Sequence, residues 1–341
     1  MGSLVAGALR GGAILGTATS ATTAVANSLR SGPFGVLALA VVASSVVTPL
    51  TIYRQAYSFS TAYALSIMGM AVALLATFDV SGSIPTVSLL AAVVVYGFRL
   101  GSFLLVRQAT VASKRDLILK FEKTPRLKRV PFSLAVGLFY ALMMTPALYL
   151  CRSASSGSVG VGVGVGVGLS ETANQIVSAS GALIWFAAIV QTWTDAQKFL
   201  AKRGNDESKD FHGPSQGWFG VSRHPNFMAE IMVWIGVFVG GLPALLNGGQ
   251  WSSMGVGNVV ALVCSVLGFS GIVQTMLGAT KRLETKQETN YGGQLPYEEW
   301  KAKTSKLVPS PTKNFVGTIL PFSISAILAF VTRKVVLHLY L

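Results

Sequence analysis

Long apolar runs separated by short polar segments dominate the chain. A membrane-spanning helix needs about 20 mainly apolar residues. Eight runs meet this requirement: 34–52, 59–78, 84–106, 131–150, 172–194, 226–248, 255–278 and 315–332. The first contains Pro49, and the last could instead be a surface helix. The pattern predicts an all-α fold, a polytopic membrane bundle of seven to eight transmembrane helices. We expect one membrane domain over 34–341, preceded by a tail over 1–33.

The connections between these runs alternate between basic and nearly uncharged. Lysine and arginine gather in three of them, 107–130, 195–225 and 279–314. The others carry almost no charge: 79–83, 151–171 and 249–254. Because basic loops are retained on the cytosol-like side of a membrane, we expect the three basic segments at one end of the bundle.

Composition agrees with a membrane protein. Hydrophobic residues make up 51% of the chain and charged residues only 12%, whereas soluble domains carry about 25% charged residues. The net charge of +14 comes from the connections rather than from a polar surface, which argues against nucleic-acid binding. The two cysteines belong to no Cys/His cluster, so neither a disulfide framework nor a metal site is indicated.

Two segments of unusual composition stand outside the spans. The first 33 residues contain Arg10 and Arg30 but no acid, which fits an organelle-targeting segment or a disordered or membrane-associated tail. We expect the endoplasmic reticulum membrane, with a plastid or mitochondrial membrane as the alternative. Gly alternates with Val from Val159 to Gly168, which predicts a flexible loop.

The segment SRHPNFMAE, residues 222–230, places polar groups where an apolar run begins. Pro225 suits the first turn of a helix, so Asn226 and Glu230 lie four residues apart on one face. Glu230 then sits about 8 Å into the span. A carboxylate at that depth is costly unless it is paired or functional.

Arg223 and His224 stand beside the N-terminal end of this helix, where free N–H groups favour anions. We interpret the segment as a socket for the anionic head of a cofactor. The alternative is an Arg-His interfacial anchor, with Glu230 paired to a neighbouring helix.

Two further groups of polar residues lie inside apolar runs. Gln191 and Asp195 lie on one helical face with Lys198 and Lys202, and this helix leaves the membrane at the basic end. The alternative is that these residues simply form a solvated helix end.

Tyr96 and Arg99 lie three residues apart within 84–106. Together they offer a proton donor and a fixed cation in a low-dielectric site. Otherwise Arg99 snorkels to the surface and Tyr96 is an interfacial aromatic.

Four stretches together resemble the C-terminal domain of the steroid 5α-reductase family: DAQKFLAKRG, GPSQGWFG, SRHPNFMAE and YEEWKAKTSKLVP. The pattern is closest to a broad branch of multi-pass membrane proteins and covers about residues 90–312. The resemblance implies a seven-helix bundle that binds NADPH in its cytosolic half. It also implies reduction of a carbon–carbon double bond conjugated to a carbonyl, in a sterol or isoprenoid-like lipid.

By resemblance, Asn226 contacts the nicotinamide amide, Glu230 supports that pocket, and Asp195 and Lys202 hold the cofactor further out. Tyr96 polarises the substrate carbonyl, with Arg99 beside it. The remaining candidate cofactor-binding residues are Gln191, Arg223, His224, Arg282, Tyr297 and Lys301.

The chain departs from the family pattern at two places. Steroid reductases pair the tyrosine with an early-helix glutamate, but no acid precedes Asp79 here, and YSFSTAYALS occupies the region where relatives often carry one. Ala229 replaces the usual glycine before the glutamate. The first departure leaves the partner of Tyr96 and the substrate open.

Two other classes of protein fit part of the pattern. Isoprenylcysteine and phospholipid methyltransferases bind S-adenosylmethionine and share an R-H-P-x-Y motif. The N-x-x-x-E spacing of Asn226 and Glu230 favours the reductase instead. A methyltransferase typically has paired glutamates before its terminal tyrosine motif, whereas the acids of YEEW follow Tyr297. A non-catalytic membrane protein that retains the fold is the third interpretation.

Overall fold

The computed structural model describes most of the chain: residues 20–31, 34–111, 116, 118–120, 122, 124–155, 169–202, 210–246, 255–309, 325–327, 329–334 and 336–338. These residues are mainly helical and include no strand, only one isolated bridge between Ser222 and Ser305. The predicted all-α membrane bundle is therefore confirmed for the described part.

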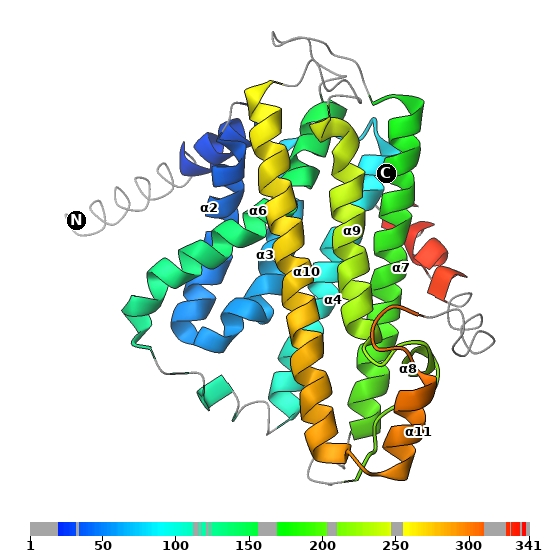
Figure 1. Cartoon of the computed structure of the whole chain (residues 1–341). Helices are drawn as coiled ribbons and strands as arrows, with labels where there is room; N and C mark the ends of the chain where they lie inside the picture. Colours follow the sequence, from blue (N-terminus) through cyan, green and yellow to red (C-terminus); the bar gives the residue numbers. More distant parts are fainter. Residues whose placement is uncertain are drawn as a thin grey trace, which may run out of the picture.

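The main helices run up and down the bundle (Figure 1). They are α2 (Gly35–Tyr53), α3 (Thr61–Thr77), α4 (Ile84–Thr110), α6 (Val130–Ser155), α7 (Glu171–Lys202), α9 (Pro225–Leu245) and α10 (Val256–Tyr291). Short helices are η1 (Gln55–Phe59), η2 (Arg126–Arg129), α8 (Trp218–Val221) and α11 (Leu295–Lys303).

Six helical stretches among the described residues are long and apolar enough to cross a membrane: Gly35–Tyr53, Ile84–Thr110, Arg126–Ser155, Glu171–Ala201, Pro225–Leu245 and Val256–Tyr291. Helix α3 is apolar but has only 17 residues, which at about 1.5 Å per residue is shorter than the hydrocarbon core. Seven of the eight predicted spans thus correspond to helices. Of the eighth, residues 315–324 and 328 lie outside the described residues.

Several helices extend beyond the end of the apolar run from which they were predicted. Helix α10 continues to Tyr291, well past the predicted end at residue 278. Backbone hydrogen bonds, not hydropathy, define a helix, so the polar turns simply project beyond the apolar zone. The projecting turns contain Glu284 and Glu288, which bind Arg223 and Lys301.

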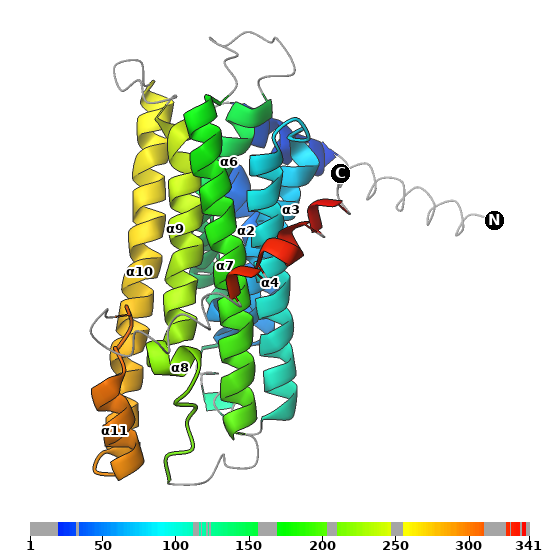
Figure 2. The same ribbon diagram turned by 90° about the vertical axis from the view of Figure 1, so that its right-hand side faces the viewer.

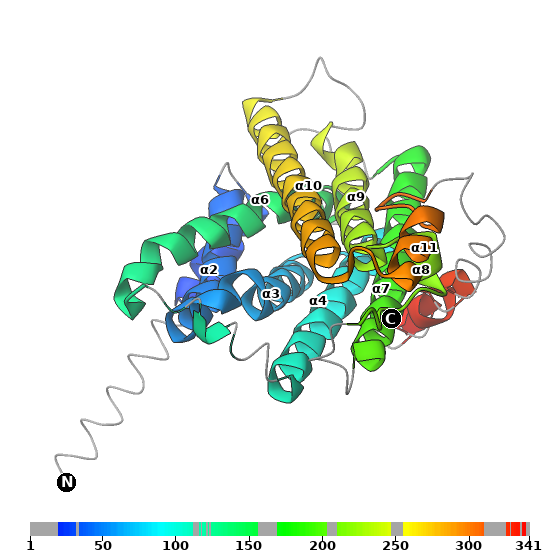
Figure 3. The same ribbon diagram turned by 60° about the horizontal axis from the view of Figure 1, so that its bottom comes forward.

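The described parts of the three basic segments share one end of the bundle, as predicted. The lower ends of α4, α7 and α10 lie there with α8 and α11 (Figure 1). Figure 3 brings this end forward and shows α8 and α11 beside α7. The predicted Gly-Val loop and most of the tail lie outside the described residues.

Close backbone approaches position the helices around the candidate site. A Cβ added at Gly97 of α4 would lie 2.8 Å from the backbone oxygen of Ala64 in α3. One at Gly236 of α9 would lie 2.9 Å from the backbone oxygen of Ser180 in α7. Because glycine alone leaves room for these contacts, α3 packs tightly on α4, and α9 on α7.

Candidate functional site

The side chain of Glu230 is buried five residues into α9 and accepts four hydrogen bonds. The hydroxyls of Tyr63 and Tyr96 each donate to Oε1 at 2.5 Å, and Trp234 Nε1 donates to the same oxygen at 3.1 Å. Gln191 Nε2 donates to Oε2 at 2.7 Å. Every contact is a donor, an arrangement that suits a carboxylate and offsets the cost of burying it.

Besides Trp234, Tyr63 is a member of this network that the sequence did not reveal. Its hydroxyl lies 3.1 Å from that of Tyr96 and accepts a hydrogen bond from Trp234 Nε1 at 2.7 Å. Its ring packs edge-on against Tyr140, with centroids 5.1 Å apart. Tyr63 lies within YSFSTAYALS, the region where relatives often carry an acid. The only signal for it was a tyrosine inside an otherwise apolar helix.

Arg99 turns into the bundle rather than toward the membrane surface. Its Nη1 donates to Gln191 Oε1 at 2.9 Å, its Nη2 donates to the Gln191 backbone oxygen at 2.8 Å, and it pairs with Asp195. Arginine can only donate and a carboxylate can only accept. The amide of Gln191 is therefore oriented, with its oxygen toward Arg99 and its nitrogen toward Glu230.

These contacts join five of the predicted site residues into one chain of polar groups. It runs from Asp195 through Arg99 and Gln191 to Glu230, and ends at Tyr96. The residues come from three helices, α4, α7 and α9, so the bundle has assembled what the sequence proposed separately. Lys198, one turn below Asp195, lies within electrostatic reach of both Asp195 and His224.

Asn226 precedes Glu230 by one helical turn, on the same face of α9. Its Oδ1 is buried and has no hydrogen-bond partner among the described residues. The buried side-chain oxygens of Gln197 and Gln287 also lack one. A buried acceptor without a donor is uncommon in folded proteins, so Asn226 is suited to accept an N–H group from a ligand.

Arg223 and His224 both contact Glu284 of α10. Arg223 Nε and Nη2 donate to the two carboxylate oxygens at 3.1 and 2.6 Å, and Nη1 donates to the backbone oxygens of Lys301 and Thr304. His224 Nε2 lies 2.6 Å from Glu284 Oε1. Burial lowers the pKa of His224, although Glu284 opposes the shift. The anion-binding role predicted for Arg223 and His224 stays a prediction, because their side chains are already engaged here.

A small pocket opens beside this cluster, between the end of α7 and α11. It has a volume of about 20 Å³, and Lys198, Arg223, Gln287 and Trp300 are among the residues that line it. That volume holds about one water molecule.

The other predicted residues lie apart from the network. Tyr297 and Lys301 both bind Glu288 Oε2, at 3.2 and 2.6 Å, and so fasten α11 to α10. Arg282 is exposed. Lys202 ends α7, and its side chain lies outside the described residues. Apart from Asn226, Arg282 and Lys202, the predicted residues thus belong either to the buried network or to the cross-links at the basic end.

Comparison with known protein families gives a match over most of the chain. The model of a family described as a protein of unknown function (DUF1295) matches residues 50–304. The matched range includes α3 with Tyr63, all of the Glu230 network and the Arg223–Glu284 pair. No curated protein and no solved structure matches the chain.

Proposed function

The chain belongs to the DUF1295 family, and from its site we propose a membrane-embedded, NADPH-dependent reductase. Its substrate would be a lipid, sterol or isoprenoid-like, with a carbon–carbon double bond conjugated to a carbonyl. The observation that carries the proposal is the buried hydroxyl of Tyr96, 2.5 Å from Glu230 Oε1. The likeness of SRHPNFMAE to the steroid 5α-reductase motif supports it, and the endoplasmic reticulum is the proposed location.

The fit of NADPH rests on Asn226. When bound, NADPH supplies a hydride. Its nicotinamide carries an amide whose N–H groups need an acceptor, and Asn226 Oδ1 is a buried acceptor without a donor. Asp195 and Lys198 continue along α7 from the network toward the basic end, where we propose that they hold the rest of the cofactor. Arg223 and His224 would contribute only if they released Glu284.

Tyr96 is the proposed catalytic residue. Hydride addition to the β-carbon of an enone places negative charge on the carbonyl oxygen, which a preorganised donor must stabilise where water is excluded. A phenol is protonated at neutral pH, so the hydroxyl of Tyr96 can donate to that oxygen. The second hydrogen added to the double bond is a proton that comes ultimately from solvent.

Tyr63 is the proposed positioning residue. Tyr96 must turn its hydroxyl from Glu230 Oε1 to the substrate, and Tyr63 remains hydrogen-bonded to that same oxygen. Trp234 and Gln191 also keep their hydrogen bonds to the carboxylate. The proposal is therefore that Tyr63 takes the part that an early-helix acid plays in steroid reductases.

A binding experiment tests the proposal before any substrate is known. NADPH affinity of the purified full chain is measured by energy transfer from tryptophan to the nicotinamide. We expect binding by the unchanged protein and weaker binding after Asn226→Ala or Asp195→Ala. Lys303→Ala, which alters an exposed lysine of α11, serves as the control. A screen of lipid enones for NADPH oxidation then identifies the substrate.

The same experiment separates the other classes. Binding of S-adenosylmethionine without NADPH would support a methyltransferase. Binding of neither would support a non-catalytic protein. Equal NADPH affinity in Asn226→Ala and Lys303→Ala would remove Asn226 from the cofactor site.

A further inference from the structure

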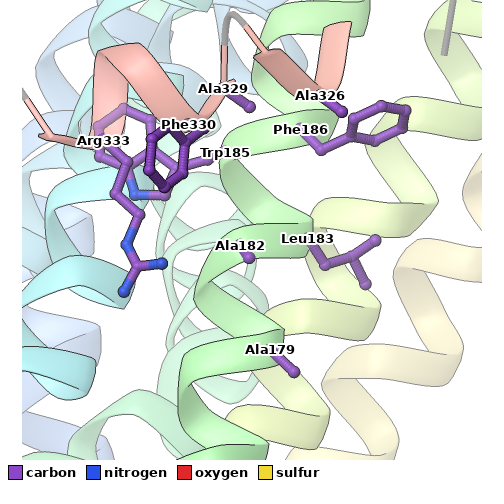
Figure 4. A pocket seen from close by; sticks show the side chains of 9 residues that line it. All are labelled: Ala179, Ala182, Leu183, Trp185, Phe186, Ala326, Ala329, Phe330 and Arg333. Atoms are coloured by element: carbon purple, nitrogen blue, oxygen red, sulfur yellow. The ribbon is translucent and has the colours of Figure 1, made fainter. Parts of the chain in front are cut away.

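A groove of about 440 Å³ lies against α7, and none of the residues that line it belongs to the Glu230 network (Figure 4). The helical segment at 325–338 crosses α7 at this point (Figure 2). Ala179, Ala182 and Phe186 line the groove from α7, and Ala329 and Phe330 line it from the C-terminal segment. Small side chains on both helices leave this space open.

The groove faces the lipid part of a bilayer. Its α7 residues belong to the apolar stretch Glu171–Ala201, which is long enough to cross a membrane. Ala182 lies eleven residues from the start of that stretch, about 16 Å along the helix axis. The surroundings at that depth are acyl chains rather than water, and the volume falls within the range of about 300–1,000 Å³ usual for ligand pockets.

One cation lines this apolar groove. Arg333 contributes to its wall, and its Nε is buried with no hydrogen-bond partner among the described residues. Figure 4 shows the guanidinium pointing away from Phe330, to the level of Ala182. Within the described part of the chain no ion pair involves Arg333.

A cation at hydrocarbon depth is costly unless an anion accompanies it. The nearest supply of anions is the bilayer itself, since acidic phospholipids combine a negative phosphate with acyl chains. Snorkelling of the arginine and local thinning of the bilayer allow such a head group to meet a side chain below the usual head-group level.

We propose that this groove binds one acidic phospholipid, with an acyl chain against Ala182 and Phe186 and the phosphate on Arg333. The lipid would complete the contact between the C-terminal segment and α7. The site is separate from the proposed cofactor site, so it stands whether or not the protein reduces a lipid.

Native mass spectrometry of the purified full chain tests the proposal. The protein is titrated with phosphatidylglycerol or phosphatidylcholine of identical acyl chains. We expect one tightly bound phosphatidylglycerol. Its affinity should exceed that of phosphatidylcholine by about tenfold or more, because one charge-assisted hydrogen bond between its phosphate and Arg333 is enough for such a ratio.

Two variants and a matched control locate the site. Arg333→Gln should lose the preference for phosphatidylglycerol. Lys334→Gln removes the same charge from the neighbouring residue, whose Nζ lies over the ring of Phe330, and should retain it. Ala182→Phe fills the groove and should weaken binding of both lipids.

The proposal is overturned if Arg333→Gln and Lys334→Gln retain phosphatidylglycerol equally. Equal binding of the two lipids by the unchanged protein would also overturn it, and so would binding of neither. If Arg333→Gln does not fold, the Ala182→Phe variant decides: undiminished binding there rejects the groove.

Discussion

The hydroxyl groups of Tyr63 and Tyr96 lie 3.1 Å apart, and both donate to the same oxygen of Glu230. Each tyrosine stands next to a residue of the α3–α4 contact, since Tyr63 precedes Ala64 and Tyr96 precedes Gly97. The close approach of the two backbones therefore brings two phenols to one carboxylate. Since both bind one oxygen, Tyr96 can turn to the substrate as the proposed catalytic residue while Tyr63 stays on Glu230 as the proposed positioning residue.

Replacement of the two tyrosines should affect activity unequally. We expect Tyr96→Phe to lower turnover by about 10²–10³, the usual effect of losing one oxyanion donor, while NADPH still binds. Tyr63→Phe should lower turnover less, because Tyr96 can still donate to the substrate while Trp234 and Gln191 keep their hydrogen bonds to Glu230. Steady-state rates on an enone found by the screen measure both effects. Full activity of Tyr96→Phe would remove it from the mechanism.

Glu230→Gln should destabilise the protein by about 1–3 kcal/mol, because the new amide nitrogen faces donors that need an acceptor. Asn226→Ala is the matched control on the same face of α9, since its Oδ1 makes no hydrogen bond. The shift of the thermal unfolding midpoint in detergent compares the two. Similar shifts would mean that the Glu230 hydrogen bonds contribute little.

Arg223 and Glu284 should be energetically coupled. Arg223→Gln and Glu284→Gln should each cost about 1.5–3 kcal/mol, typical of hydrogen bonds to charged groups. The double variant should cost less than the sum, because both changes remove the same contact. The exposed pair of Lys303 and Glu299, 3.6 Å apart, should show almost no coupling. Additive effects for Arg223 and Glu284 would contradict the cross-link.

Acidification should destabilise the basic end through His224. Burial lowers the pKa of this residue, so the folded chain binds fewer protons than the unfolded chain near and below the ordinary value of about 6.5. The stabilisation is fully present above that value and is lost as the pH falls through the lowered pKa.

Unfolding midpoints at about pH 7.5 and about pH 5.5 measure this dependence. The fall in stability between them should shrink in His224→Gln and persist in His338→Gln, which changes an exposed histidine. An unchanged fall in His224→Gln would assign the dependence to other groups.

Single cysteines should report the sidedness of the bundle. With Cys151 and Cys264 replaced by serine, cysteines at Lys120 and Lys303 should react with an impermeant reagent from the same side of the membrane. A cysteine at Ser81, an exposed position in the opposite connection, should react from the other side. Labelling of Lys120 and Lys303 from opposite faces would reject the topology.

The motif residues were predictable because they lie close together in the sequence. The spacing of Asn226 and Glu230 fixes them on one face of α9, and that of Gln191 and Asp195 fixes them on one face of α7. Among the partners that were missed, Tyr63 and Glu284 lie in helices far along the chain, whereas Trp234 lies one turn after Glu230 in α9. Glu284 was hidden for a further reason, since it lies where α10 continues beyond its apolar run.

The sequence by itself determined the membrane bundle, seven of its helices, the common end of the basic segments and the need of Glu230 for partners. Hydropathy and helical period are local properties, so a window of the chain contains them. The tertiary structure alone decided which partners those are. Tyr96 and Tyr63 meet Glu230 across 134 and 167 residues of chain, and Arg99 turns inward to Gln191 and Asp195. Such contacts depend on how far each helix is rotated and how closely glycines let neighbours approach, and no local pattern specifies either.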